Sequence, residues 1–189
     1  MRIESVEQSD AVLAEAAQQG RLDSFGALYQ RYHNPIVALA YAQLGDKHSA
    51  EDAAQEVFAI ACRDLRSLRD RDKFGAWLGG ICRNVTKQML RVKTRTAPLP
   101  GRDAISCVSE DAQQEQEEQW DAVRKAVWKL PEAERELVVM RYFNGFSQAM
   151  ISQVLDMTPA AVNGRLTRAK RRIAQLLKRD GFGSESWDA

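Results

Sequence analysis

The sequence of 189 residues is poor in the residue types that build covalent or metal frameworks. Its three cysteines, Cys62, Cys82 and Cys107, are widely spaced, which excludes a disulfide framework and a CxxC metal pair. With His33 and His48 as its two histidines, the chain is not expected to hold a zinc site. Cys62 and Cys82 stand among apolar neighbours, so we expect both to be small buried side chains. No metal site and no cofactor are predicted.

Long apolar runs are also missing. No run of about 18 apolar residues occurs, which excludes a membrane-spanning helix. The first 20 residues lack the apolar core of a signal peptide, so we expect a cytoplasmic protein without membrane insertion. No phosphate-binding loop, HExxH motif or nucleophile with a paired base is present, so neither catalytic residues nor a small-molecule substrate are predicted.

The net charge of +1 conceals an uneven distribution of charge along the chain. Residues 63–95 hold ten basic and three acidic side chains, and residues 158–179 hold seven basic and no acidic ones. Between them, residues 98–122 hold one arginine and seven acids. Two basic stretches separated by an acidic segment predict two surfaces that face a polyanion.

The acidic segment has the composition of a linker. It is rich in proline, serine and charged residues and poor in large apolar ones, so it cannot bury enough surface to offset the entropy of ordering. We therefore expect a domain over residues 1–95, a linker over 96–119, a second domain over 120–179 and a tail over 180–189. The last few linker residues can instead be the first turns of the next helix. The tail is either a frayed end or a short regulatory contact through Trp187.

The rest of the chain is predicted to be helical, because there are five prolines and no alternating runs of β-branched residues. Apolar spacing in the first half predicts helices over 24–44, 49–65 and 74–95, with a break at 66–73. Asp23 or Ser24 can cap the first helix, Gly45 can end it, and Ser49 can cap the second.

One face of the predicted helix over 74–95 carries basic and amide side chains with no acid among them. These are Arg83, Asn84, Lys87, Gln88, Arg91 and Arg95. A face that is merely solvated usually mixes charge signs, because like charges four residues apart destabilise a helix. We therefore favour a nucleic-acid-binding face over a solvated one. Trp77 in the same helix can be a core residue or a stacking surface, and its register favours the core.

The C-terminal third is predicted to contain a helix-turn-helix. Helices are expected over 121–130, 131–143, 147–155 and 159–179, with Ser147 and Thr158 as N-caps and Pro159 in a first turn. A short helix, a three-residue turn and a basic second helix are typical of this motif, whose second helix enters the major groove. The same pattern can also be a plain helical hairpin.

Three segments, taken in order, resemble a sigma factor of the sigma-70 family, of the small extracytoplasmic-function type with only regions 2 and 4. They are FGALYQRYHNPIVALAYAQLGDKHSAEDAAQEVFAIACRDL, KFGAWLGGICRNVTKQMLR and LPEAERELVVMRYFNGFSQAMISQVLDMTPAAVNGRLTRAKRRIAQLL. The stretches AEDAAQEVF and AWLGGICRN are the most specific. The resemblance implies an all-α fold of two small domains, a region 2 helical bundle and a region 4 helix-turn-helix, joined by a flexible acidic linker.

The resemblance also implies partners and site residues. Core RNA polymerase would contact Asp52, Gln55 and Glu56. The melted −10 non-template strand would contact Arg69, Lys73, Arg83, Asn84, Lys87 and Arg91, with the loop over 66–73 holding a flipped base. The −35 duplex would contact Thr158, Pro159, Ala160, Asn163, Arg165, Arg168 and Arg171. An anti-sigma factor is expected as an inhibitor.

The expected function is therefore that of a transcription initiation factor that directs core polymerase to promoters, and not that of an enzyme. The alternative is a stand-alone helix-turn-helix transcriptional regulator. Such a regulator would need neither the AEDAAQEVF stretch nor two separated basic modules. A helical signalling adaptor, the third possibility, does not explain two acid-free basic faces.

Overall fold

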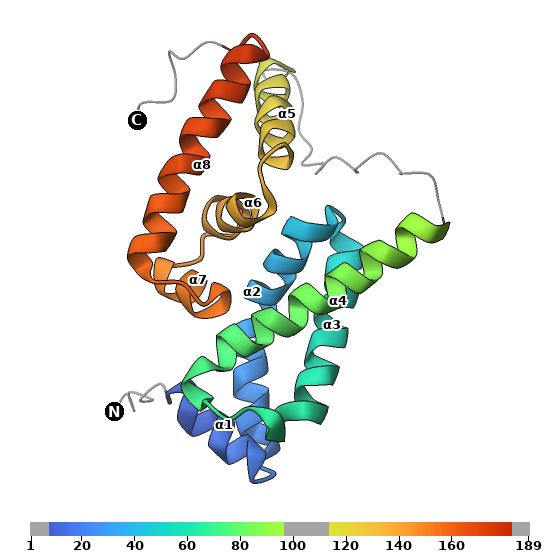
Figure 1. Cartoon of the computed structure of the whole chain (residues 1–189), viewed down its shortest axis with the longest axis vertical. Coiled ribbons are helices and arrows are strands. Elements are labelled where there is room, and N and C mark those ends of the chain that lie inside the picture. The colour runs from blue at the N-terminus through green and yellow to red at the C-terminus, as the bar shows by residue number, and fades with distance from the viewer. Residues whose placement is uncertain (1–7, 97–113, 183–189) are drawn as a thin grey trace.

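The computed structural model describes residues 8–96 and 114–182, and every regular element within them is helical (Figure 1). This confirms the predicted all-α fold. No helix in the described ranges is long and apolar enough to cross a membrane. The first half contains α1 (Asp10–Gln18), α2 (Leu22–Leu44), α3 (Lys47–Asp64), the 3-10 turns η1 (Leu65–Ser67) and η2 (Arg71–Lys73), and α4 (Phe74–Thr96). The second half contains α5 (Gln114–Trp128), α6 (Glu132–Val138), the π-helical turn η3 (Val139–Phe143), α7 (Gln148–Leu155) and α8 (Pro159–Arg179).

At the turn between α2 and α3, the predicted end of α2 is confirmed and the predicted start of α3 is wrong. Gly45 ends α2 in the left-handed conformation, with φ 74°, as expected for a glycine at this place. Ser49, however, is not the cap of α3. The carboxylate of Asp46 accepts a hydrogen bond of 2.8 Å from the Ser49 backbone N–H, so the helix begins earlier, at Lys47. An aspartate three residues before the expected start displaced the serine from the capping role.

The start of the first half also differs from the prediction. Helix α2 begins at Leu22 with Arg21 in the cap position, so neither Asp23 nor Ser24 caps it. Helix α1, which the sequence did not predict, precedes it and is capped by Ser9. Helix α1 has nine residues, and four of them in its sequence, DAVLAEAAQ, are alanine. Small side chains give little apolar periodicity, which explains why this helix escaped prediction.

The helix-turn-helix is formed by α7 and α8. Ser147 caps α7 and Thr158 caps α8, each side chain accepting a hydrogen bond of 3.2 Å from a backbone N–H three residues later. Asp156 lies in the turn with φ 53°, a left-handed conformation that an aspartate tolerates better than most residues. The caps confirm both predicted helix starts.

Residues 114–119, the end of the predicted linker, belong to α5, which confirms the alternative that they begin the next helix. Residues 97–113, with Cys107, lie outside the described residues, as does Trp187 in the tail.

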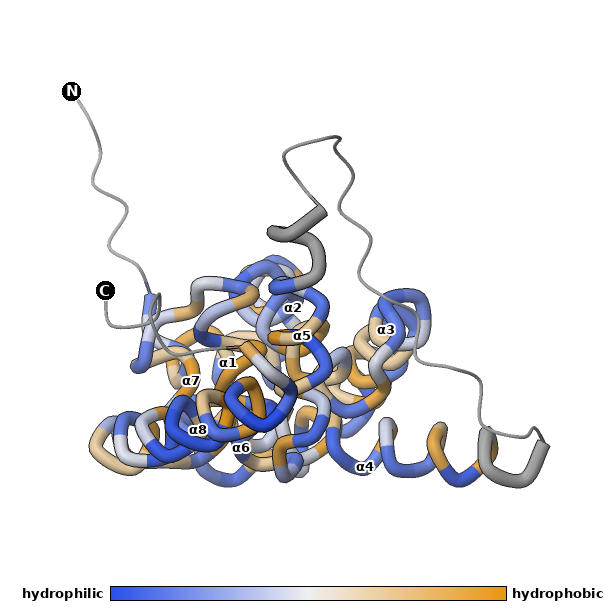
Figure 2. Tube along the Cα trace, turned by 90° about the horizontal axis from the view of Figure 1, so that it is seen from above, coloured by the Kyte–Doolittle hydropathy of each residue, from blue (hydrophilic) through white to orange (hydrophobic). Residues whose placement is uncertain are grey.

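One hydrophobic core contains side chains from both halves of the chain. Its largest fully buried members include Tyr32 and Phe74 from the first half and Leu137, Met140 and Ile151 from the second. A second, smaller cluster joins α5 to α8. Figure 2 shows hydrophilic and hydrophobic positions around α4 and α8, as expected for helices with one face in a core.

The two halves meet along a surface that we call the seam, made by α2 and α4 on one side and α6 and α7 on the other (Figure 1). Near its middle, α4 and α7 approach through their backbones, since a Cβ atom at Gly79 would lie 2.2 Å from the Val154 carbonyl oxygen. Beside the seam, the indole of Trp128, the last residue of α5, packs on Gly45 and edge-on to Tyr41. The seam therefore fixes where the functional faces of the two halves lie.

Candidate nucleic-acid and polymerase interface

The predicted −10 residues on α4 lie along its basic face. Arg83, Lys87 and Arg91 are spaced four residues apart, which places them on one side of a helix. Asn84, Lys87 and Arg91 are exposed, and the side chain of Arg83 is 37% exposed. On the opposite side Leu78, Cys82 and Val85 are buried in the core. The helix thus presents a continuous basic stripe, of which Arg83 is the end nearest the seam.

The other two predicted −10 residues come from the segment between α3 and α4. Arg69 is exposed in the loop, and Lys73, at the end of η2, lies 3.8 Å from the carboxylate of Asp156. Leu65 and Leu68 point inward and are buried. Two buried leucines therefore anchor the loop to the hydrophobic core, while its polar side chains are exposed to solvent.

Glu136, which the sequence analysis missed, is the centre of a polar network in the seam. It is 4% exposed, accepts a hydrogen bond of 2.6 Å from the Gln43 amide, and pairs with Arg83 at 3.2 Å. The hydroxyl of Thr86, fully buried in α4, donates to the side-chain amide oxygen of Gln43. Every carboxylate oxygen of Glu136 thus has a donor, as a buried charge requires. A threonine on the otherwise apolar face of α4 was the available indication of this network.

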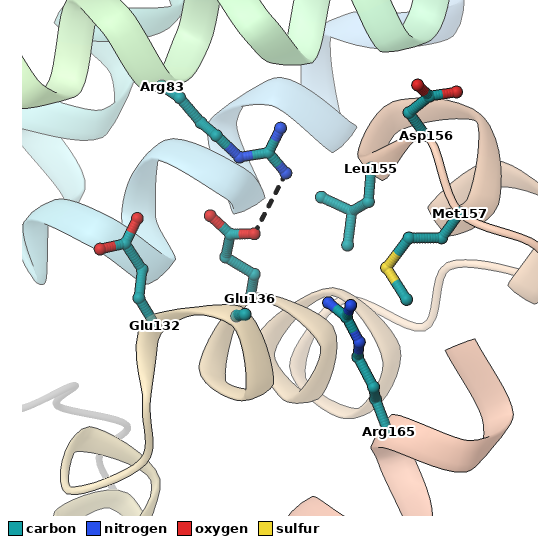
Figure 3. Close-up of a pocket in the computed structure, with 8 residues that line it drawn as sticks. Arg83, Glu132, Glu136, Leu155, Asp156, Met157 and Arg165 are labelled. Atoms are coloured by element: carbon teal, nitrogen blue, oxygen red, sulfur yellow. Dashed lines mark hydrogen bonds and ion pairs between the residues drawn. The ribbon is translucent and has the colours of Figure 1, made fainter. Parts of the chain in front are cut away.

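A cavity of about 350 Å³ lies beside this network (Figure 3). Arg83 of the −10 set and Arg165 of the −35 set point into it from opposite sides, with the carboxylate of Glu136 between α4 and α6. The wall is completed by residues of α6, by Leu155 at the end of α7 and by Met157 in the turn before α8. The structure therefore brings one residue of each predicted DNA set to the same place.

The predicted −35 residues lie on α8 and its cap. Val162, Leu166 and Ala169 are buried, which holds one face of α8 on the core. Six predicted residues are exposed on the remaining surface, and Arg165 is half-buried. The exposed residues are Thr158, Pro159, Ala160, Asn163, Arg168 and Arg171.

The residues predicted to bind polymerase lie apart from both DNA sets. Asp52, Gln55 and Glu56 are exposed on α3, whose opposite face buries Ala53 and Val57. Within the described residues these three polar side chains make no hydrogen bond or ion pair, which leaves an acidic surface on one helix.

Two further expectations are settled by burial. Cys82 is fully buried, and its burial raises the pKa of the thiol to about 12. Cys62 is exposed, so the prediction that it is buried was wrong. The helical register turns Cys62 away from Val57 and Ala61, which are buried. Trp77 packs against the core with its ring 5.9 Å from that of Phe74, which supports its role as a core residue.

Comparison with known proteins places both halves in described families. Residues 28–96 match Sigma-70 region 2, and residues 120–173 match Sigma-70, region 4. The ECF RNA polymerase sigma factor BldN of Streptomyces coelicolor is 31% identical over 89% of this chain and 66% of its own length. The ECF RNA polymerase sigma-E factor of Escherichia coli is 30% identical over 89% of this chain and 94% of its own length.

Two solved structures have a similar fold. The structure of CnrH in complex with the cytosolic domain of CnrY has a TM-score of 0.60 and 25% identity over 92% of this chain and 99% of that one. The sigma factor RpoE of Bartonella quintana, in complex with the anti-sigma factor NepR, has a TM-score of 0.56 and 22% identity. That match covers 82% of this chain and 98% of the other, and it bears on the fold alone.

Proposed function

Because the chain belongs to the sigma-70 family of RNA polymerase sigma factors, of the extracytoplasmic-function type, we propose that it directs core polymerase to promoters through two separate DNA contacts. As a sigma factor it is a transcription initiation factor, and the polymerase supplies the chemistry. One observation carries the proposal: each of the two regions presents an exposed basic face on one helix, α4 in region 2 and α8 in region 4.

The first contact is with the melted non-template strand of the −10 element. A groove of basic side chains that follows the phosphates is the usual means of holding a single strand. Such a groove is offered by the exposed face of α4, where Arg83, Lys87 and Arg91 follow one another at steps of four residues and Asn84 lies beside Arg83. The basic surface is extended toward the loop by Arg69 and Lys73. The loop over residues 66–73 would hold a base that has left the stack, which requires a pocket of fixed shape.

The second contact is with the −35 element as duplex. In helix-turn-helix proteins the N-terminal residues of the second helix contact base edges in the major groove. Thr158, Pro159 and Ala160 occupy that end of α8, and Asn163 and Arg165 follow within two turns. Asparagine pairs in a bidentate manner with adenine and arginine with guanine. Arg168 lies farther along the helix and is also a candidate for the groove, whereas Arg171 would contact phosphates, which adds affinity without sequence preference.

Two of the arginines assigned to the DNA contacts face the closed seam. Arg83 is paired with Glu136, and Arg165 faces the same cavity as Arg83. We therefore propose that the seam opens when the chain binds polymerase and promoter. Domain boundaries that suit this movement are residues 1–95 for region 2, 96–119 for the linker, 120–179 for region 4 and 180–189 for a tail.

Two protein partners complete the proposal. Core RNA polymerase would dock on the acidic face of α3 through Asp52, Gln55 and Glu56. An anti-sigma factor would hold the chain inactive. The similar structure of CnrH is a complex with the cytosolic domain of CnrY, which supports a protein partner bound to a chain of this kind.

A run-off assay with purified core polymerase and a pool of genomic DNA fragments tests the proposal. The chain is expected to direct initiation from a small set of shared promoters. The double variant Asp52→Lys with Glu56→Lys should abolish initiation, because it reverses the charge of the docking face. Asp23→Lys, which reverses one exposed carboxylate on α2, is the control and should leave initiation unchanged. DNA binding without polymerase and no initiation would instead support the stand-alone regulator.

A further inference from the structure

The side chain of Gln18, in the last turn of α1, is bound to three points on the segment that joins α3 to α4. Its amide nitrogen donates to the Leu65 carbonyl oxygen at 3.0 Å and to the Leu68 carbonyl oxygen at 2.9 Å. Its amide oxygen accepts a hydrogen bond of 2.9 Å from Nε of Arg71. All three bonds are non-local, between residues 47 to 53 positions apart in the sequence. One carboxamide thus spans η1, the loop and the first residue of η2.

These bonds fix the backbone at the places where the loop turns inward. Leu65 and Leu68 are buried, whereas Arg66, Ser67 and Arg69 are exposed. A carbonyl that loses its donor in a part-buried site costs free energy unless water replaces the donor. The exposed residues therefore lie on a backbone that cannot shift without breaking at least one bond to Gln18.

Helix α1 is itself a firm support for Gln18. The carboxylate of Asp10, at the other end of the helix, pairs with Arg31 and accepts a hydrogen bond from the Tyr32 hydroxyl, both on α2. Leu13 and Ala14 are buried in the shared core. The first turn of α1 is therefore fixed by an ion pair and a hydrogen bond to α2, and the rest of the helix is fixed by packing. The last turn carries the Gln18 amide that binds the loop.

We propose that Gln18 is a positioning residue for the −10 contact: it sets the shape of the loop over residues 66–73 and so determines how selectively that loop holds one unstacked base. The inference rests on the proposed function, which assigns the base to this loop. Gln18 is not placed against the DNA. It acts through the carbonyls of Leu65 and Leu68 and through Arg71.

Gln18→Glu is the sharpest test, because it keeps the size of the side chain and removes both donors. A carboxylate would face two carbonyl oxygens and repel them, while its pairing with Arg71 would remain. Gln19→Glu, one residue farther along, is the matched control. Gln19 is exposed, and its side chain makes no hydrogen bond to the described loop, so this change introduces the same charge at the same helix end.

The measurement uses holoenzyme and a pool of single-stranded oligonucleotides with six randomised positions, followed by sequencing of the bound fraction. The wild type and Gln19→Glu are expected to show the same base preferences. In Gln18→Glu, the preference at one position or two adjacent ones should fall about tenfold, the size expected for the loss of two neutral hydrogen bonds. The preferences at the other positions should remain.

Two results would overturn the inference. The first is an unchanged preference at every position in Gln18→Glu. The second is an equal loss at all positions, which would mean a general loss of folding or binding. Hydrogen exchange of the Leu68 and Lys73 amides gives an independent check, since both bonds close turns of this segment and should exchange faster in Gln18→Glu alone. A wild-type holoenzyme with no base preference at all would refute the proposed function itself.

Discussion

A Cβ atom at Gly79 would lie 2.2 Å from the carbonyl oxygen of Val154, closer than van der Waals contact allows. Helices α4 and α7 therefore touch through their backbones at this point, and no other residue type at position 79 can preserve the contact. Region 2 and region 4 therefore approach closely at a point where one of them has no side chain.

Gly79→Ala is expected to push α7 away from α4 and to lower the free energy of unfolding by about 1–3 kcal/mol, as overpacking of a tight contact does. Urea denaturation measures this change in the free energy of unfolding. Gly80→Ala in the same helix is the control. Nothing lies within 4 Å of a Cβ there, so alanine should stabilise the helix by about 0.5–1 kcal/mol. Equal stabilities for the two variants would contradict the close contact.

Glu136→Leu should destabilise the free chain by about 2 kcal/mol, because the Gln43 amide would lose its acceptor inside the seam. Arg83→Ala should cost less, since Arg83 is 37% exposed and Glu136 keeps its bond to Gln43. Glu132→Leu, an exposed residue that lines the same cavity, is the matched control. In thermal melts of the three variants, Glu136→Leu should have the lowest melting temperature. Equal melting temperatures for Glu136→Leu and Glu132→Leu would show that the network does not stabilise the chain.

Two changes on α8 should affect DNA binding in different ways. Asn163→Ala is expected to relax the base preference at one −35 position, at a cost of about 1–3 kcal/mol for the preferred base. Arg171→Ala should weaken binding to all sequences alike and reduce the slope of log affinity against log salt by about 1. Binding of holoenzyme to duplex fragments at several salt concentrations separates the two. A uniform loss in Asn163→Ala would show that it does not contact a base.

The two described cysteines should differ sharply in reactivity. Cys62 is exposed and should react with iodoacetamide in the native protein. Burial raises the pKa of the Cys82 thiol to about 12, so at pH 8 the thiolate that reacts is almost absent and the sulfur is also shielded. Mass spectrometry of a Cys107→Ser variant should find one label on the folded chain and a second after addition of urea. Labelling of Cys82 without denaturant would show that the seam and the core beneath it open readily.

Much of the fold followed from apolar spacing and capping residues. The helix-turn-helix was predictable because Ser147 and Thr158 cap helices whose buried faces have clear periodicity. Helix α1 was not, because alanines mark no face. Ser49 was assigned the capping role that Asp46 performs, since a local pattern does not decide between two competing acceptors.

The exposed basic faces of α4 and α8 were predictable from the sequence, but the contacts of their side chains were not. The basic stripe on α4 can be predicted from the sequence, yet the ion pair that its Arg83 makes with Glu136 joins residues 53 positions apart. The same is true of Gln18, whose three partners belong to a segment far along the chain. Non-local pairs of polar residues have no period, so only the packed helices show that a glutamine in α1 holds a loop before α4.

The hydrophobic core that runs through both halves has a consequence for how the chain melts. Because buried side chains of α2 and α4 share neighbours with those of α6 and α7, neither half can lose its packing without exposing apolar surface of the other. The unbound chain is therefore expected to unfold in a single calorimetric transition, although two families describe it. The proposed opening of the seam would then require the polymerase to cover the apolar surface that the two halves bury against each other.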